Sequence, residues 1–151
     1  MSIKAAIENY LSIIVTDEGE EAERIQKLIV SLDELALAAN KINVTFDEHY
    51  YPEPPPRDYD DTRKNIGKLF PSLGIYNIAL DVSDQIAQTT LAIGDAIDDM
   101  ADIAGDLEEV LWRFKNTSEN DALFNFKFLF RIHWGMHLRE LQLYLHDLSV
   151  R

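Results

Sequence analysis

The chain has 151 residues and carries 27 aspartates and glutamates against 14 lysines and arginines, giving a formal net charge of −13. It contains no cysteine, which excludes disulfides, thiol chemistry and thiolate metal sites. The negative charge disfavours binding to nucleic acid and to anionic lipid, because both would repel the protein. It favours a basic protein partner instead.

The length fits a single domain, which can bury about 70% of the surface of its unfolded chain. No apolar run approaches the roughly 20 residues of a membrane span. The N-terminus is briefly apolar, but it lacks the basic region and cleavage site of a secretory signal. We therefore expect a cytoplasmic protein without membrane association.

Residues 1–42 predict a helical hairpin. Apolar residues recur at helical spacing from Ile3 to Ile14, and Ser2 is a plausible N-cap. A second apolar face runs from Ile25 to Ala39. Acidic residues precede this second helix and suit the positive end of its dipole.

Residues 43–61 have a different composition. The segment Pro52-Glu-Pro-Pro-Pro56 favours extended, polyproline-like backbone. We interpret residues 43–61 as a stiff strap that crosses the helices, with its tyrosines packed underneath. The alternative is that its prolines are a ligand for a domain with an aromatic groove.

Residues 62–148 predict a helical core. A short helix is expected over 62–70, and a longer one over 84–114, where a break near Gly94 stays open. Periodicity does not decide between helix and extended chain for residues 73–80. Because no strand pattern is convincing, the predicted class is all-α, a single-domain helical bundle over residues 1–151.

A long, central C-terminal helix is predicted from Asn120 to about Leu148. It is apolar on two sides, which is typical of a helix that packs in the middle of a bundle. Gly135 in its middle costs about 1 kcal/mol relative to alanine. We interpret this glycine as a point where a neighbouring helix or side chain approaches closely.

Six carboxylates form a stripe on the predicted helix before residue 114, mostly turned away from its apolar face. Like charges four residues apart cost about 0.2–0.5 kcal/mol per pair, and no lysine or arginine occurs between Lys68 and Arg113. The stripe therefore predicts that positive charge reaches it from elsewhere, either from Lys127 and Arg131 or from a basic partner. The predicted partner-binding residues are Asp95, Asp98, Asp99, Asp102, Asp106 and Glu109.

The same stripe contains Asp98-Asp-Met-Ala-Asp102, the DDxxD pattern of magnesium-diphosphate enzymes. This chain is much too short for the usual fold of those enzymes. A pattern of this kind on an amphipathic helix is also typical of a solvated face. The motif alone is therefore weak evidence for magnesium.

His133 and His137 have the i,i+4 spacing of paired metal ligands on a helix, although the glutamate of a zinc-peptidase motif is missing. With an aspartate from the acidic helix, the pair would hold a transition metal. The alternative is a structural role, in which Asp99 or Asp106 reaches across to a histidine or to Arg131.

No nucleophile elbow, Walker loop or dinucleotide-binding glycine motif is present. The sequence therefore predicts no cofactor, and it favours a protein that is not an enzyme.

Three segments together resemble a bacterial helical family of unknown function, DUF5063. They are Phe70-Pro-Ser-Leu-Gly-Ile-Tyr76, Asp98-Asp-Met-Ala-Asp-Ile-Ala-Gly-Asp-Leu107 and His133-Trp-Gly-Met-His137. The likeness spans roughly residues 45–148. That family has no established activity, so the resemblance implies only a small, standalone, all-helical bacterial protein.

The leading functional hypothesis is an immunity or antitoxin protein whose carboxylate stripe caps the cationic site of a basic toxin, such as a nuclease. The alternative is a metal-dependent helical-bundle enzyme that uses His133, His137 and an aspartate. A third hypothesis is a scaffold that docks through its proline strap. The sequence leaves the partner and the oligomeric state open.

Overall fold

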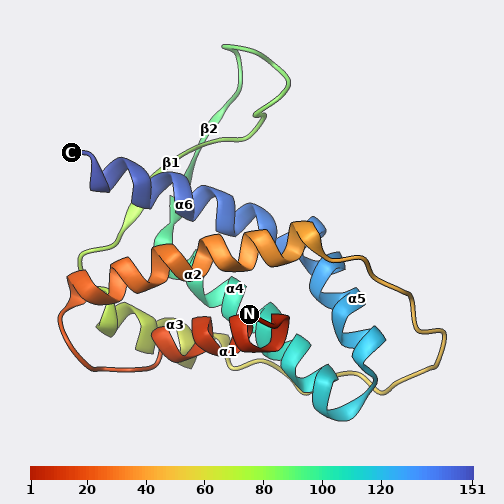
Figure 1. The fold of residues 1–151 in the computed structure, drawn as a ribbon. Helices are drawn as coiled ribbons and strands as arrows, with labels where there is room; N and C mark the ends of the chain where they lie inside the picture. The colour runs from red at the N-terminus through yellow and green to blue at the C-terminus, as the bar shows by residue number, and fades with distance from the viewer.

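The computed structural model describes residues 1–151 as a helical bundle from which one β-hairpin projects (Figure 1). Its helices are α1 (Ile3–Ile13), α2 (Glu21–Lys41), α3 (Tyr59–Leu69), α4 (Ala96–Asn116), α5 (Glu119–Leu129) and α6 (Gly135–Ser149). A five-residue π-helical segment, η1 (Phe130–Trp134), joins α5 to α6. The strands are β1 (Ile75–Ala79) and β2 (Leu91–Asp95). None of the helices combines the length and apolarity needed to cross a membrane.

The predicted N-terminal helical hairpin is confirmed as α1 and α2, which pack against each other. Ser2 is the N-cap of α1, and its side chain accepts a hydrogen bond from the backbone N–H of Ala5. The hydroxyl of buried Tyr10 donates to the carbonyl of Met100 at 2.8 Å. This bond fastens the hairpin to α4, which also packs against α3, α5, η1 and α6.

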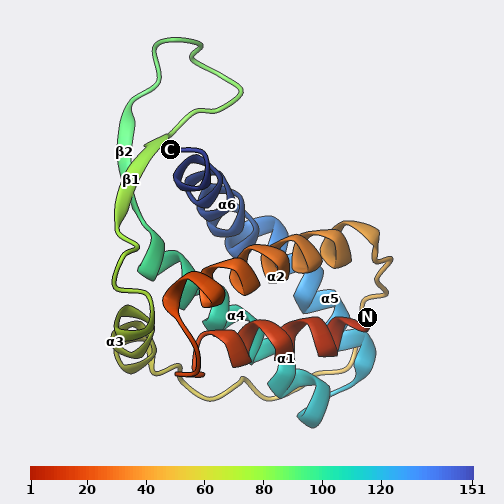
Figure 2. The same cartoon turned by 60° about the vertical axis from the view of Figure 1, so that its left-hand side comes forward.

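The all-α prediction is correct for the bundle and wrong for residues 75–95, where two antiparallel strands pair. Part of the helix expected over 84–114 is therefore loop and strand, and α4 begins at Ala96. Asp95 ends the strand and caps the helix, because its side chain accepts from the backbone N–H of Ile97 at 2.9 Å. Figure 2 shows the hairpin standing away from the bundle beside the C-terminal end of α6.

Gly94 makes room for an aromatic ring across the hairpin. Tyr76 and Gly94 are opposite each other in the strand register, and the Tyr76 ring lies against the glycine backbone. A Cβ atom at position 94 would lie 2.5 Å from that ring. The glycine therefore lets the ring cover the strand on the side of the bundle.

The strap predicted over residues 43–61 is confirmed up to Asp58, because the backbone between α2 and α3 has no helix or strand, and it is wrong for residues 59–61, which begin α3. Its tyrosines behave differently from one another. Tyr50 is 93% exposed, whereas half-buried Tyr51 donates its hydroxyl to Asp47 at 2.7 Å. The expectation that the strap packs its tyrosines underneath is therefore wrong for Tyr50.

The predicted C-terminal helix is interrupted by the π-helical segment η1. Gly135 follows this wider turn, which leaves no room for a side chain at that position. A Cβ atom at position 135 would lie 2.2 Å from the carbonyl oxygen of Phe130, which belongs to the same run of helix. The close approach expected from a neighbouring helix is thus made by the chain itself. π-Helical turns of this kind often occur at functional sites.

Replacing Gly135 with alanine is expected to destabilise the protein by about 2–3 kcal/mol, the upper range for overpacking, because the clash is with backbone. Urea unfolding followed by circular dichroism measures the effect. Gly74→Ala is the matched control, since a Cβ at position 74 meets no atom within 4 Å. Equal stability of the two variants would show that η1 does not require glycine.

Candidate metal centre

Most of the carboxylate stripe on α4 is paired within the chain. The side chains of Asp99 and Asp106 are buried. Asp95 lies 2.5 Å from Arg63. Glu109 lies 3.8 Å from both Arg57 and Arg113. The expectation of a free, outward-facing stripe is therefore wrong for these four residues. A helical wheel describes one isolated helix, so it cannot show which other elements pack along the sides of that helix.

The positive charge that the stripe predicts comes from other residues than expected. It is supplied by Arg57 at the end of the strap, Arg63 on α3 and Arg113 on α4 itself. Lys127 instead donates to the carbonyl of Ala39. No ion pair is formed by Arg131, which is exposed.

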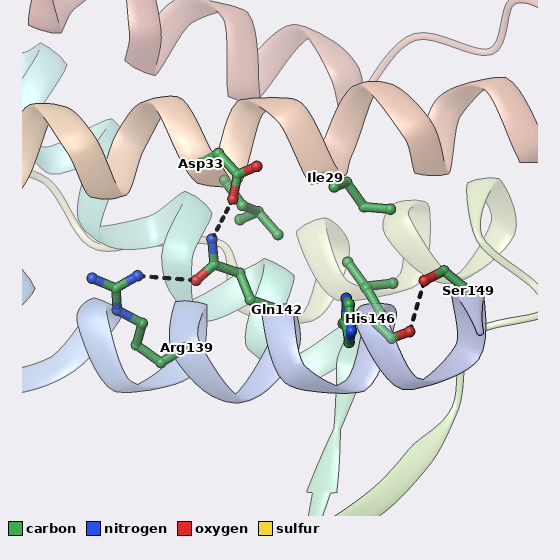
Figure 3. A pocket seen from close by; sticks show the side chains of 8 residues that line it. Ile29, Asp33, Arg139, Gln142, His146 and Ser149 are labelled. Atoms are coloured by element: carbon green, nitrogen blue, oxygen red, sulfur yellow. Dashed lines mark hydrogen bonds between the residues drawn. The ribbon is translucent and has the colours of Figure 1, made fainter. Parts of the chain in front are cut away.

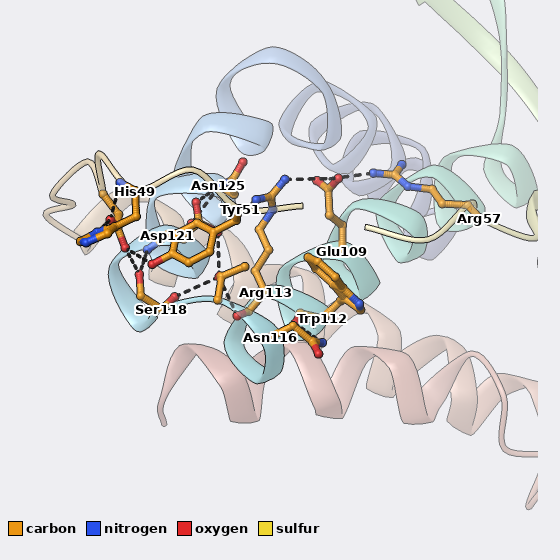
Figure 4. A network of polar contacts seen from close by, with 12 residues as sticks. His49, Tyr51, Arg57, Glu109, Trp112, Arg113, Asn116, Ser118, Asp121 and Asn125 are labelled. Atoms are coloured by element: carbon orange, nitrogen blue, oxygen red, sulfur yellow. Dashed lines mark hydrogen bonds and ion pairs between the residues drawn. The ribbon is translucent and has the colours of Figure 1, made fainter. Parts of the chain in front are cut away.

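Figure 4 shows that Arg57 and Arg113 belong to a chain of polar contacts along α4. Arg57 and Arg113 both approach Glu109 at 3.8 Å, and Arg113 continues to buried Asp121 at 3.0 Å. Hydrogen bonds to Asp121 also come from Thr117 and Asn125. This network fastens the strap and the start of α5 to α4, so its role is structural.

The two remaining buried carboxylates of the stripe each hold a histidine. Nδ1 of His133 lies 2.6 Å from Asp106, and Nδ1 of His137 lies 2.7 Å from Asp99. The prediction that Asp99 or Asp106 reaches across to a histidine is confirmed for both. Because carboxylates accept, Nδ1 is the donating nitrogen of both rings, and Nε2 is the nitrogen that a metal would use.

Asp102 completes a cluster with the two histidines. Its carboxylate lies 3.3 Å from Nε2 of His137. One ligand atom each from Asp102, His133 and His137 can be chosen so that all three lie within 4.8 Å of one another. Their side chains are 25%, 39% and 24% exposed, so the cluster is open to solvent.

The surroundings of the cluster are strongly negative. The hydrogen bond that His137 donates to Asp99 raises the pKa of His137, against the effect of burial, and the charges of Asp102 and Asp98 raise it further. Burial raises the pKa of Asp98, and the charge of Asp102 adds to this. Such a field attracts a cation.

The DDxxD pattern does not gather its three carboxylates at one place. Asp99 is buried and bonded to His137, whereas Asp98 and Asp102 are half-exposed. A helix turns by about 100° per residue, so neighbouring aspartates point in different directions. Two of the three carboxylates, those of Asp99 and Asp102, instead contact the ring of His137.

A cavity of about 350 Å³ between α2 and α6 is a weaker candidate (Figure 3). Gln142 donates to Asp33 at 2.9 Å and accepts from Arg139 at 3.2 Å. The polar side chains that line this cavity thus largely form hydrogen bonds with one another. They do not converge on a free position as the ligand atoms of Asp102, His133 and His137 do.

Comparison with known proteins gives a family and a fold. A family described as "Domain of unknown function (DUF5063)" matches residues 2–151. The crystal structure of protein BF1032 from Bacteroides fragilis is similar, with a TM-score of 0.69 and 20% identity, over 97% of this chain and 84% of that chain. At this identity the likeness shows the fold alone. No curated protein matches the chain.

Proposed function

The chain belongs to the DUF5063 family, and from the geometry of its histidine cluster we propose that it is a metal-dependent enzyme. It binds one divalent transition metal through Asp102, His133 and His137. The main support for this proposal is that three ligand atoms of the types that such metals prefer lie close together at one partly exposed site. This proposal corresponds to the second of the hypotheses drawn from the sequence.

The distances are compatible with coordination after a small adjustment of the side chains. Ligand atoms at about 2.0–2.2 Å from a tetrahedral zinc lie roughly 3.4 Å from each other. Nε2 of His137 and the Asp102 carboxylate are already 3.3 Å apart. His133, at 39% exposure, is the most accessible of the three ligands.

The residues behind the histidines support the same proposal. In metal sites, a histidine ligand almost always donates its other ring N–H to a carboxylate, a carbonyl or water. Here Asp106 and Asp99 accept from Nδ1 of His133 and His137, and both carboxylates are buried. Nε2 of His137 also lies 3.3 Å from a third carboxylate, that of Asp102, which a purely structural histidine does not require.

The open coordination positions indicate the chemistry. A divalent metal with three protein ligands keeps a position for water and lowers the pKa of that water to about 7, so metal-assisted hydrolysis is the reaction class that the site supports best. Asp98 lies one turn before Asp102 on α4 and is the candidate to accept a proton, since no other residue pairs with its side chain.

Metal uptake tests the proposal. Protein stripped with a chelator is dialysed against Zn²⁺ or Co²⁺, and its metal content is measured by mass spectrometry. We expect one metal per chain and visible absorption bands from protein-bound Co²⁺. Failure to retain any of Mn²⁺, Fe²⁺, Co²⁺, Ni²⁺ or Zn²⁺ in stoichiometric amount would contradict the proposal.

A basic protein partner, such as a toxin neutralised by this chain, is a second proposal. It is favoured by the stretch from residue 69 to 112, which includes the projecting hairpin and has no lysine or arginine. Within the stripe, Asp98 is the one carboxylate that forms no ion pair, although the charges of His137 and His133 act on it. The double variant Asp98→Asn, Asp102→Asn should weaken binding to such a partner and reduce its salt dependence. An unchanged affinity in a salt titration would count against the stripe.

A further inference from the structure

The hairpin contributes a residue to the metal centre from outside the bundle. Asp99 accepts from His137 at one carboxylate oxygen and from the hydroxyl of Tyr76, on β1, at the other. The Tyr76 ring stacks on Tyr144 of α6 at 4.7 Å between ring centroids, and its other neighbour is Gly94. Packing on both sides therefore fixes the hydroxyl that holds Asp99.

The strap contributes to the metal centre in the same way. Asp106 accepts from His133 at one carboxylate oxygen and from Arg57 at the other, at 2.6 and 2.8 Å. Arg57 lies across α4 at Gly105, where an added Cβ would be 3.1 Å from its side chain. The glycine lets the guanidinium lie close to the helix and reach the buried carboxylate.

We propose that Tyr76 and Arg57 are positioning residues of the metal centre, acting through Asp99 and Asp106. The inference rests on the proposed function. A carboxylate bonded at both oxygens cannot rotate, so the imidazole that it holds keeps a fixed ring orientation. The hairpin and the strap, which are the two long non-helical segments, thereby align the two histidines with Asp102.

Metal affinity tests this proposal, with Co²⁺ as the probe in competition with a chromophoric chelator. Tyr76→Phe and Arg57→Gln are each expected to weaken binding by about tenfold, the lower end of the range for outer-shell partners of metal ligands. Arg57→Lys, which keeps the charge, should recover part of the loss.

Two variants provide matched controls. Tyr51→Phe removes a tyrosine–aspartate hydrogen bond of the same kind at Asp47, and Arg63→Gln removes an arginine–aspartate pair at Asp95. Neither of these aspartates bonds to His133 or His137. Both controls are therefore expected to bind Co²⁺ as the wild type does.

Imidazole NMR of the metal-free protein separates positioning from general loss of structure. Tyr76→Phe should move the ring signals of His137 and leave those of His133, whereas Arg57→Gln should do the reverse. Wild-type Co²⁺ affinity in both variants would overturn the positioning roles while the proposed function stands. A wild-type protein that takes up no metal would overturn both proposals.

Discussion

Replacing His133 or His137 with alanine is expected to weaken Co²⁺ binding by about 100-fold or more, above the range for outer-shell residues. Each substitution removes one of three ligands, and two remaining ligands rarely hold a borderline metal against a chelator. Asp102→Ala should have a comparable effect. Chelator competition measures the affinity, and loss of the visible Co²⁺ bands reports the change in coordination.

His49→Ala is the control for this experiment, because His49 also pairs with an aspartate, Asp47, at 2.7 Å. That pair lies in the strap, and the His49 side chain is 84% exposed. It has no third ligand beside it. The variant should bind Co²⁺ like the wild type, and an equal loss in His49→Ala would mean that uptake is not specific to the cluster.

Asp106→Asn is expected to lower the free energy of unfolding by about 2 kcal/mol in the presence of a chelator. Breaking a fully buried ion pair costs about 3–5 kcal/mol, and the value is smaller here because solvent screens Arg57 and His133, which are each 39% exposed. Asparagine keeps the shape but removes the charge that pairs with Arg57 and weakens the acceptor for Nδ1 of His133. Urea unfolding gives the free energy.

Asp98→Asn is the matched control, since Asp98 is on the same helix and no cation pairs with it. Its effect should stay within about 0.5 kcal/mol, the usual range for a surface substitution without special contacts. Removing the repulsion between Asp98 and Asp102 can make the effect slightly stabilising. A loss in Asp98→Asn as large as in Asp106→Asn would refute a specific role for the buried ion pairs.

The sequence left residues 73–80 open between helix and extended chain, and β1 shows that residues 75–79 are extended. The second strand and the pairing were not predicted, because the sequence signal of the β-hairpin is short. β1 and β2 contain only five residues each, and both include small or polar residues that an amphipathic helix also tolerates. β2 runs directly into α4, so the apolar residues before Asp95 extend the helical pattern without a break. Alternation over so few residues does not distinguish the two periods.

Part of the candidate site could be predicted from the sequence. The spacing of His133 and His137 indicates paired ligands, and the density of aspartates on the preceding helix indicates that one of them is available. The sequence named Asp99 and Asp106 as carboxylates that reach a histidine, but it did not show that Asp102 is the one that faces Nε2 of His137. Asp99 and Asp102 differ by three positions on one helix, yet one is buried behind a histidine and the other faces Nε2.

The sequence by itself determined the helices with strong periodicity, the Ser2 cap, the extended strap and the family. These follow from local rules, namely side-chain period, capping and the fixed backbone of proline. Only the tertiary structure decided that Arg57 and Tyr76 reach the buried carboxylates of α4. Tyr76 is 23 positions from Asp99 in the chain, and Arg57 is 49 positions from Asp106. No local pattern encodes which distant side chain meets a buried carboxylate.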